Sequence, residues 1–227
     1  MSVETHRVLL GTCGWKHQDW LNDFYSEDLP EEWQLGFYAN EFPVVYVPAA
    51  DWLGDADVEE WTEDVSDSFR FILEIPENVL NDEEGFVSAI NKVKTLGEFC
   101  LGLVFQLSHD LRKDIQLVQK RLEVAQAIAP VCIDNCGTPF TTEFKQFLQK
   151  QNTSEVWNGK EANKDLTNAP LSICRVSGDT LDMASLRKVV EVCLAASSDN
   201  CISVLCLEGE PPSLEKLRNA DIILNLI

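Results

Sequence analysis

Charged side chains stand at or near the ends of several short apolar runs in this sequence. Glu74, Asp134 and Glu208 occur in this way, and His109 follows a fourth run. Carboxylates and imidazole are suitable ligands for Mg2+ or Mn2+, and a bound ion can activate water or polarise a carbonyl. If the fold brings these side chains together, the pattern predicts a metal site that supports hydrolysis of a small polar or phosphorylated substrate.

Arg175 offers the same carboxylates a different partner. It lies in the apolar run from Leu171 to Val176, where an unpaired buried carboxylate would be costly. A structural ion pair between Arg175 and Glu74 or Asp134 is therefore the interpretation that we favour over a metal site. Candidate catalytic residues are Glu74, Asp134, Arg175 and His109, and candidate metal ligands are Glu74, Asp134 and Glu208.

Four further residues are candidates for ligand binding. Trp15 and Trp52 follow strand-like runs and could stack on a sugar or a base, although aromatic rings more often fill a core. Gln106 and Asn135 are polar residues at the ends of two other runs. The sequence leaves both interpretations of Trp15 open.

Polar residues also follow the first two runs. Lys16, His17 and Asp51 are placed there, and Cys13 lies just before them. A solvated loop is the simpler interpretation of His17, because the sequence gives it no partner. Cys13 has no histidine placed beside it, so we do not expect a nucleophilic thiol.

The elements that must position these side chains alternate along the chain. Short apolar runs typical of buried parallel strands are separated by longer helical patterns, which predicts βαβ units. Eight such strands favour a small and irregular TIM-type (β/α)8 barrel, and an open parallel α/β sheet is the alternative. The expected strands are Arg7 to Gly11, Val44 to Val47, Phe69 to Ile75, Cys100 to Leu107, Val131 to Asn135, Ser154 to Asn158, Leu171 to Val176, and Cys201 to Leu207.

Helices are predicted from apolar residues spaced three or four apart. One helix runs from Leu111 to Ile128, and Ser108 or Asp110 is the expected N-cap. A short helix is expected near residues 58–65. Further helices carry the stripes Phe140, Phe144, Phe147 and Leu148; Leu186, Val189, Val190, Cys193 and Leu194; and Leu214, Leu217, Ala220 and Ile223.

Composition narrows the functional classes. The formal charge is −20, from 38 acidic and 18 basic residues, which makes nucleic-acid binding and an endonuclease-like barrel unfavourable. A small-molecule ligand remains compatible with this charge.

Residues 1–227 read as a single β/α-barrel domain, with no low-complexity linker. No apolar leader or span appears, so we expect a cytoplasmic protein whose eight cysteines are reduced. Oligomeric state is not predicted.

One series of motifs resembles a known family. Gly11-Thr-Cys-Gly-Trp15 is followed by Asp19-Trp20, Phe24-Tyr25 and Leu29-Pro30. The series is similar to the opening of the YecE-like family, also called domain of unknown function 72, whose members begin with Gly-Thr-Ser-Gly-Trp. Weaker matches follow in order to the region of Asn219-Ala220. The resemblance implies a TIM-type barrel with no established activity, and this chain would be a divergent and shortened member.

Several residues depart from what the resemblance implies. The usual acidic residue ending strand two falls on Tyr46, and the usual lysine of strand three falls on Glu74. A Glu-x-Arg-His at strand five falls on Cys132-Ile-Asp-Asn135, whereas Arg175 and Gln106 match. Because most polar pocket positions are replaced, we expect a binding or scaffold protein without the ancestral activity. Metal-assisted hydrolysis is the alternative, so the sequence leaves open whether the protein is an enzyme.

Overall fold

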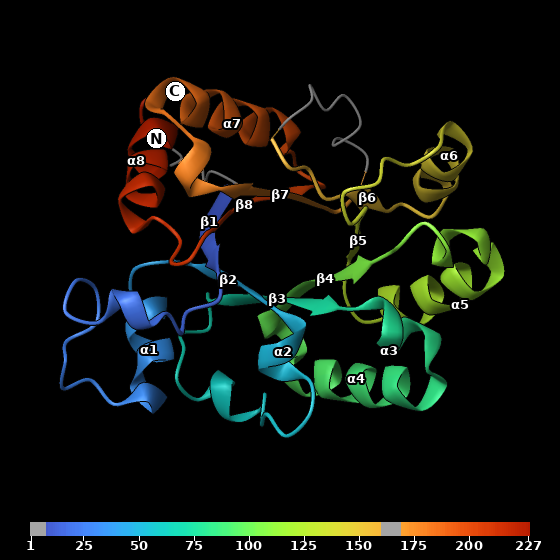
Figure 1. Cartoon of the computed structure of the whole chain (residues 1–227), viewed down its shortest axis with the longest axis horizontal. Helices are drawn as coiled ribbons and strands as arrows, with labels where there is room; N and C mark the ends of the chain where they lie inside the picture. Colours follow the sequence, from blue (N-terminus) through green and yellow to red (C-terminus); the bar gives the residue numbers. More distant parts are fainter. Residues whose placement is uncertain (1–7, 160–168) are drawn as a thin grey trace.

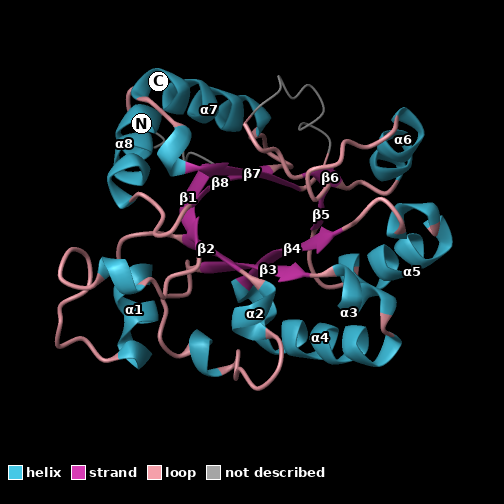
Figure 2. Ribbon diagram, in the orientation of Figure 1, coloured by secondary structure: helices cyan, strands magenta, loops and turns pink. Residues whose placement is uncertain are grey.

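The structure is a computed structural model, in which eight parallel strands form the centre of the molecule. Figures 1 and 2 show the sheet with its surrounding helices. The structure describes residues 8–159 and 169–227. All eight predicted strands are confirmed within one or a few residues at each end, except that Arg7, the predicted start of the first strand, lies outside the described residues. They are β1 (Val8–Cys13), β2 (Val44–Val47), β3 (Arg70–Ile75), β4 (Cys100–Gln106), β5 (Val131–Asp134), β6 (Ser154–Glu155), β7 (Leu171–Ser177) and β8 (Ile202–Glu208).

The strands curl into a nearly closed barrel. Hydrogen-bonded neighbours run in the order β6-β5-β4-β3-β2-β1-β8-β7, so β6 and β7 are the two ends of the sheet. A parallel bridge between Trp157 and Cys174 joins these ends. The Trp157 amide donates to the Ile173 carbonyl at 2.9 Å, and the Arg175 amide donates to the Trp157 carbonyl at 2.8 Å. The predicted barrel is thus confirmed over the open sheet, with β6 as its weakest strand.

Helices surround the barrel on its outside (Figure 2). Asp114 accepts from the Leu117 amide and caps the helix after β4, because a separate 3-10 turn, Leu111–Lys113, precedes it. The predicted caps Ser108 and Asp110 are therefore wrong for that helix, and the helix expected near residues 58–65 is one 3-10 turn, Glu60–Thr62. The α-helices are α1 (Gln34–Ala39), α2 (Ala49–Trp52), α3 (Glu77–Asn81), α4 (Glu83–Leu96), α5 (Ile115–Gln126), α6 (Thr142–Lys150), α7 (Met183–Ala196) and α8 (Leu214–Leu224).

Two apolar cores result from the alternation of side chains along each strand. Inward-facing residues form a small core inside the barrel, which includes Val44, Ile72, Cys132, Ile173 and Cys206. Their sequence neighbours face outward and form a larger core with the helices. Six of the eight cysteines are buried, as expected of thiols that act as small apolar side chains. None of the described helices is long and apolar enough to cross a membrane.

Candidate functional site at the barrel mouth

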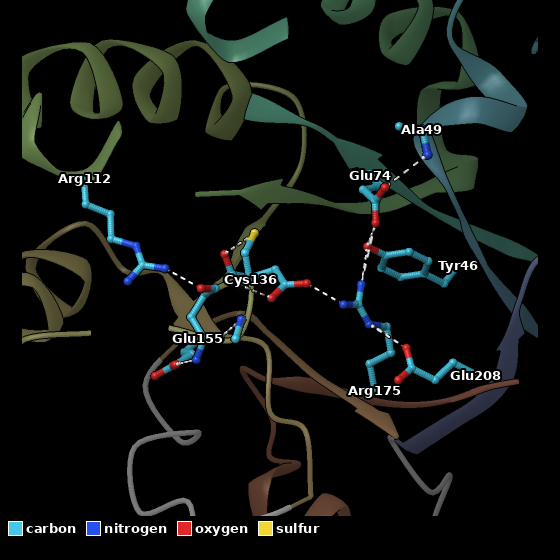
Figure 3. Close-up of polar contacts among 11 residues, drawn as sticks. Tyr46, Ala49, Glu74, Arg112, Cys136, Glu155, Arg175 and Glu208 are labelled. Atoms are coloured by element: carbon cyan, nitrogen blue, oxygen red, sulfur yellow. Dashed lines mark hydrogen bonds and ion pairs between the residues drawn. The ribbon is translucent and has the colours of Figure 1, made fainter. Parts of the chain in front are cut away.

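A single guanidinium group occupies the C-terminal mouth of the barrel. Arg175, near the end of β7, donates to the phenolic oxygen of Tyr46 at 2.8 Å and to the carboxylate of Asp134 (Figure 3). Its Nε lies 3.2 Å from Glu208 Oε2, and its Nη1 lies 3.6 Å from Glu74 Oε2. One side chain therefore links β7 to the ends of β2, β3, β5 and β8.

The alternation of each strand explains why these side chains meet. Arg175 comes two residues after Ile173, Glu74 two after Ile72, Asp134 two after Cys132, Glu208 two after Cys206, and Tyr46 two after Val44. All five earlier residues point into the barrel core. Residues two apart on a strand share a face, so the five polar groups form the next inward-facing layer towards the mouth.

Glu74 is held in place by three donors. The Tyr46 hydroxyl donates to Glu74 Oε2 at 2.6 Å, and the Ala49 amide donates to Oε1 at 3.3 Å. The indole of Trp52 donates to the Glu74 carbonyl oxygen at 2.8 Å. Tyr46 thus stands between the carboxylate of Glu74 and the guanidinium of Arg175, and α2 is tied to the end of β3.

Asp134 is fixed by the loop that follows β5. Its Oδ1 accepts from the Cys136 amide at 2.8 Å, which leaves Oδ2 for Arg175. The next residue, Asn135, donates to Glu155 Oε1 at 2.6 Å, and its carbonyl accepts from Arg112. Arg112 is buried and also donates to the carbonyl oxygens of the loops after β4 and β5, so it braces this side of the mouth.

Burial and nearby charges keep Arg175 and Tyr46 each in one protonation state. Burial lowers the pKa of Arg175, but nearby negative charges, including those of Asp134 and Glu208, oppose burial and raise the net pKa above the ordinary value. Burial also raises the pKa of Tyr46 well above its usual range, although Arg175 opposes the shift. Arg175 is therefore a permanent cation, and Tyr46 stays a neutral hydroxyl donor to Glu74.

A pocket of about 460 Å³ opens beside this network. Arg175, Tyr46, Glu74 and Glu208 contribute to its walls, so its floor is the ion-pair network itself. The rest of the lining includes Cys13 at the end of β1, Lys16 and His17 in the turn after it, Asp51 in α2, and Glu210 in the turn after β8. Its size is within the usual range for small-molecule sites.

The turn after β1 forms one wall of the pocket. Gly14 adopts a φ of 75°, which lets the chain fold back so that His17 Nε2 comes 2.9 Å from the Cys13 carbonyl oxygen. The His17 ring also packs on Trp20, with centroids 4.5 Å apart. Burial raises the pKa of the Cys13 thiol well above its usual range, so this pocket-lining thiol stays protonated.

The structure sorts the predicted catalytic and metal-binding residues into two groups. Glu74, Asp134, Glu208 and Arg175 converge, whereas His109 lies exposed in the turn after β4 and does not line the pocket. Within residues 8–159 and 169–227, no group of three or more His, Cys, Asp or Glu side chains is arranged to hold a metal ion. Instead, Arg175 occupies the centre of the carboxylates.

The four predicted ligand-binding residues lie elsewhere. Trp15 and Trp52 have exposed fractions of 2% and 0%, and Trp15 packs edge-to-face on Trp61 at 5.1 Å, so both rings belong to the core. Gln106 is half-buried at the end of β4, beside Asp134 in the sheet register. Asn135 is half-buried, donates to Glu155 on β6 and accepts from the Gly137 amide in its own loop. None of the four lines the pocket.

Sequence reasoning missed two residues of this site. The sequence identifies Tyr46 only as the position where the family's usual acidic residue is replaced. Its hydroxyl nevertheless lies between Arg175 and Glu74. Its place two residues after inward-facing Val44 was the signal that could have identified it. Glu210 lines the pocket from beyond the end of β8, where strand alternation no longer predicts direction, so no pattern in the sequence identifies it.

The sequence matches the model of one protein family over most of its length. The family model described as "Protein of unknown function DUF72" matches residues 9–203. The chain belongs to this family. The match begins within β1 and ends within β8, so it spans almost the whole DUF72 barrel and confirms the resemblance of the opening motifs. None of the curated proteins searched matches the chain.

Proposed function

We propose that this DUF72 barrel is a binding protein for a small polar molecule, with the pocket at the barrel mouth as its site and without metal-assisted catalysis. The observation that carries the proposal is the position of Arg175 among Asp134, Glu208 and Glu74. Its guanidinium supplies the positive charge that a metal ion would supply. The carboxylates that a hydrolase would use as ligands are thereby engaged.

Burial supports a structural role for this network. The exposed side-chain fractions of Arg175, Glu74 and Asp134 are 20%, 13% and 12%. Buried charges need partners, and removal of one partner leaves the others uncompensated. The network therefore supports a rigid floor for the pocket, and the formal charge of −20 makes a nucleic-acid ligand unfavourable.

A second candidate, metal-assisted hydrolysis, is favoured by the convergence of three carboxylates at the catalytic face of the barrel. Thermal melting after EDTA treatment, with Mg2+ or Mn2+ added back singly at matched ionic strength, separates the two. A metal at about 100 times its Kd adds roughly 2.7 kcal/mol, or a shift of about 5–10 °C in a domain of this size.

We expect no shift with either metal. Asp134→Asn is the pocket variant, and Glu98→Gln, at the opposite end of the barrel before β4, is the charge-matched control. A shift of the size above that occurs in the parent and in Glu98→Gln, but not in Asp134→Asn, would contradict the proposal and favour the hydrolase.

A further inference from the structure

The pocket at the barrel mouth contains more acceptors than donors. Four carboxylates line it, from Asp51, Glu74, Glu208 and Glu210, against the two cationic side chains of Lys16 and Arg175 and the imidazole of His17, whose Nε2 contacts the Cys13 carbonyl oxygen. The carboxylates come from the ends of β3 and β8, from helix α2 and from the turn beyond β8, so the surplus is a property of the whole cavity. This pocket is the site of the proposed function, and its excess of carboxylates favours a positively charged ligand.

Neither basic group is available to an anionic ligand. Each of the three nitrogens of Arg175 already contacts a protein oxygen, from Glu208, Tyr46 or Asp134. Lys16 is directed to Glu31 Oε1 at 3.0 Å, on the exposed outer side of the turn. An anion entering the pocket would have to compete with carboxylates for both cations.

Two of the carboxylates are uncommitted. Within the described residues, the side chains of Asp51 and Glu210 make no hydrogen bond and no ion pair. Asp51 and Glu210 are both exposed, and partial burial raises the pKa of Asp51 although the nearby Lys16 and His17 oppose the shift. Both groups line the same cavity, Asp51 from helix α2 and Glu210 from the turn after β8.

We infer that the pocket binds a small organic cation that carries ammonium or guanidinium groups. The cation lies between Asp51, Glu210 and the Glu208 carboxylate oxygen that does not contact Arg175. This rests on the proposed function, since it names the ligand class of the same site. Ammonium and guanidinium groups are donors only, so they complement a cavity whose free groups are acceptors. Glu74 and Arg175 then form the floor beneath the ligand.

Isothermal titration of the full chain tests the inference with agmatine and spermidine as cationic probes, glucose as a neutral probe and citrate as an anionic probe. We expect the cations to bind and citrate not to bind. The double variant Asp51→Asn/Glu210→Gln should weaken cation binding about tenfold or more, because it removes two of the charges that face the bound cation. Neither Asp51 nor Glu210 belongs to the ion-pair network of Arg175, so the double variant should fold.

A matched control separates the pocket from the general acidity of the protein. Glu84→Gln/Glu98→Gln removes the same charge from exposed positions in α4 and before β4, and we expect its cation affinity to equal that of the parent. Equal weakening in both double variants, or no cation binding by the parent, would overturn the cation inference. Pocket-dependent binding of glucose or citrate without cation binding would overturn it and leave the proposed binding function intact. Absence of binding by all four probes would count against both.

Discussion

At the scale of the residue, the site shows which chemistry can be predicted from sequence. Arg175, Glu74 and Asp134 could be placed together because each follows an inward-facing strand residue by two positions, and parallel strands end at one rim. The roles of Trp15 and Trp52 could not be predicted in this way. Both follow strand ends, but the turns beyond β1 and β2 direct their rings back into the core.

Asp51 provides a prediction at the same scale. Burial raises its pKa, so the folded state disfavours its ionised form and loses stability as pH rises through that pKa. We expect Asp51→Asn to melt at a higher temperature than the parent at pH 7. The difference should shrink as the pH is lowered through the acidic range, because the parent carboxyl then becomes protonated.

Thermal melting of parent and variant across this pH range makes the measurement. Asp28→Asn, which alters an exposed carboxylate, is the control and should show no such pH-dependent difference. A lower melting temperature for Asp51→Asn at pH 7 would show that the Asp51 charge stabilises the fold, contrary to its place in an acceptor-rich pocket.

At the scale of the element, strands were easier to predict than helix ends. Apolar runs located all eight strands, because their inward and outward faces are both buried. The start of α5 was misplaced because Leu111 and the residues after it continue the helical spacing, although they form a separate 3-10 turn. Periodicity cannot distinguish this turn from a first helical turn, since both bury the same face.

A pair of substitutions tests the corrected start of α5. Asp114→Ala removes the acceptor for the Leu117 amide and should lower the free energy of unfolding by about 1 kcal/mol. Asp110→Ala removes only an exposed pair with Lys113 and should cost well under about 0.5 kcal/mol. Urea denaturation measures both. Equal losses, or a larger loss for Asp110→Ala, would return the helix start to the position predicted from sequence.

At the scale of the whole molecule, the barrel carries a large negative charge around a mouth that is also acidic. Topology was predictable from the alternation of strands and helices, and the net charge from composition. Barrel closure could be predicted only as the preferred of two alternatives, because it depends on the two-residue strand β6 and, among the described residues, on the bridge of Trp157 to Cys174. So short a run gives almost no periodic signal.

The net charge predicts a salt effect on stability. Mutual repulsion of surface charges destabilises the compact state, and added salt shortens the screening length from about 10 Å at 0.1 M to about 3 Å at 1 M. We therefore expect the melting temperature at pH 7.5 to rise with NaCl over this range. The rise should be smaller near the sequence pI of about 4.4, where the net charge is small. A fall with added salt at pH 7.5 would show that attractive ion pairs outweigh the repulsion.

Arg175 is the counter-charge of the buried carboxylates Glu74 and Asp134. A double-mutant cycle with Arg175→Met and Asp134→Asn measures this pairing directly from urea denaturation of the parent, the two single variants and the double variant. The exposed pair of Arg187 and Glu191 provides a reference cycle, where about 0.3–0.5 kcal/mol is expected. We predict a coupling free energy of about 2 kcal/mol or more for Arg175 and Asp134. A coupling no larger than the reference would contradict the structural ion pair and the pocket floor built on it.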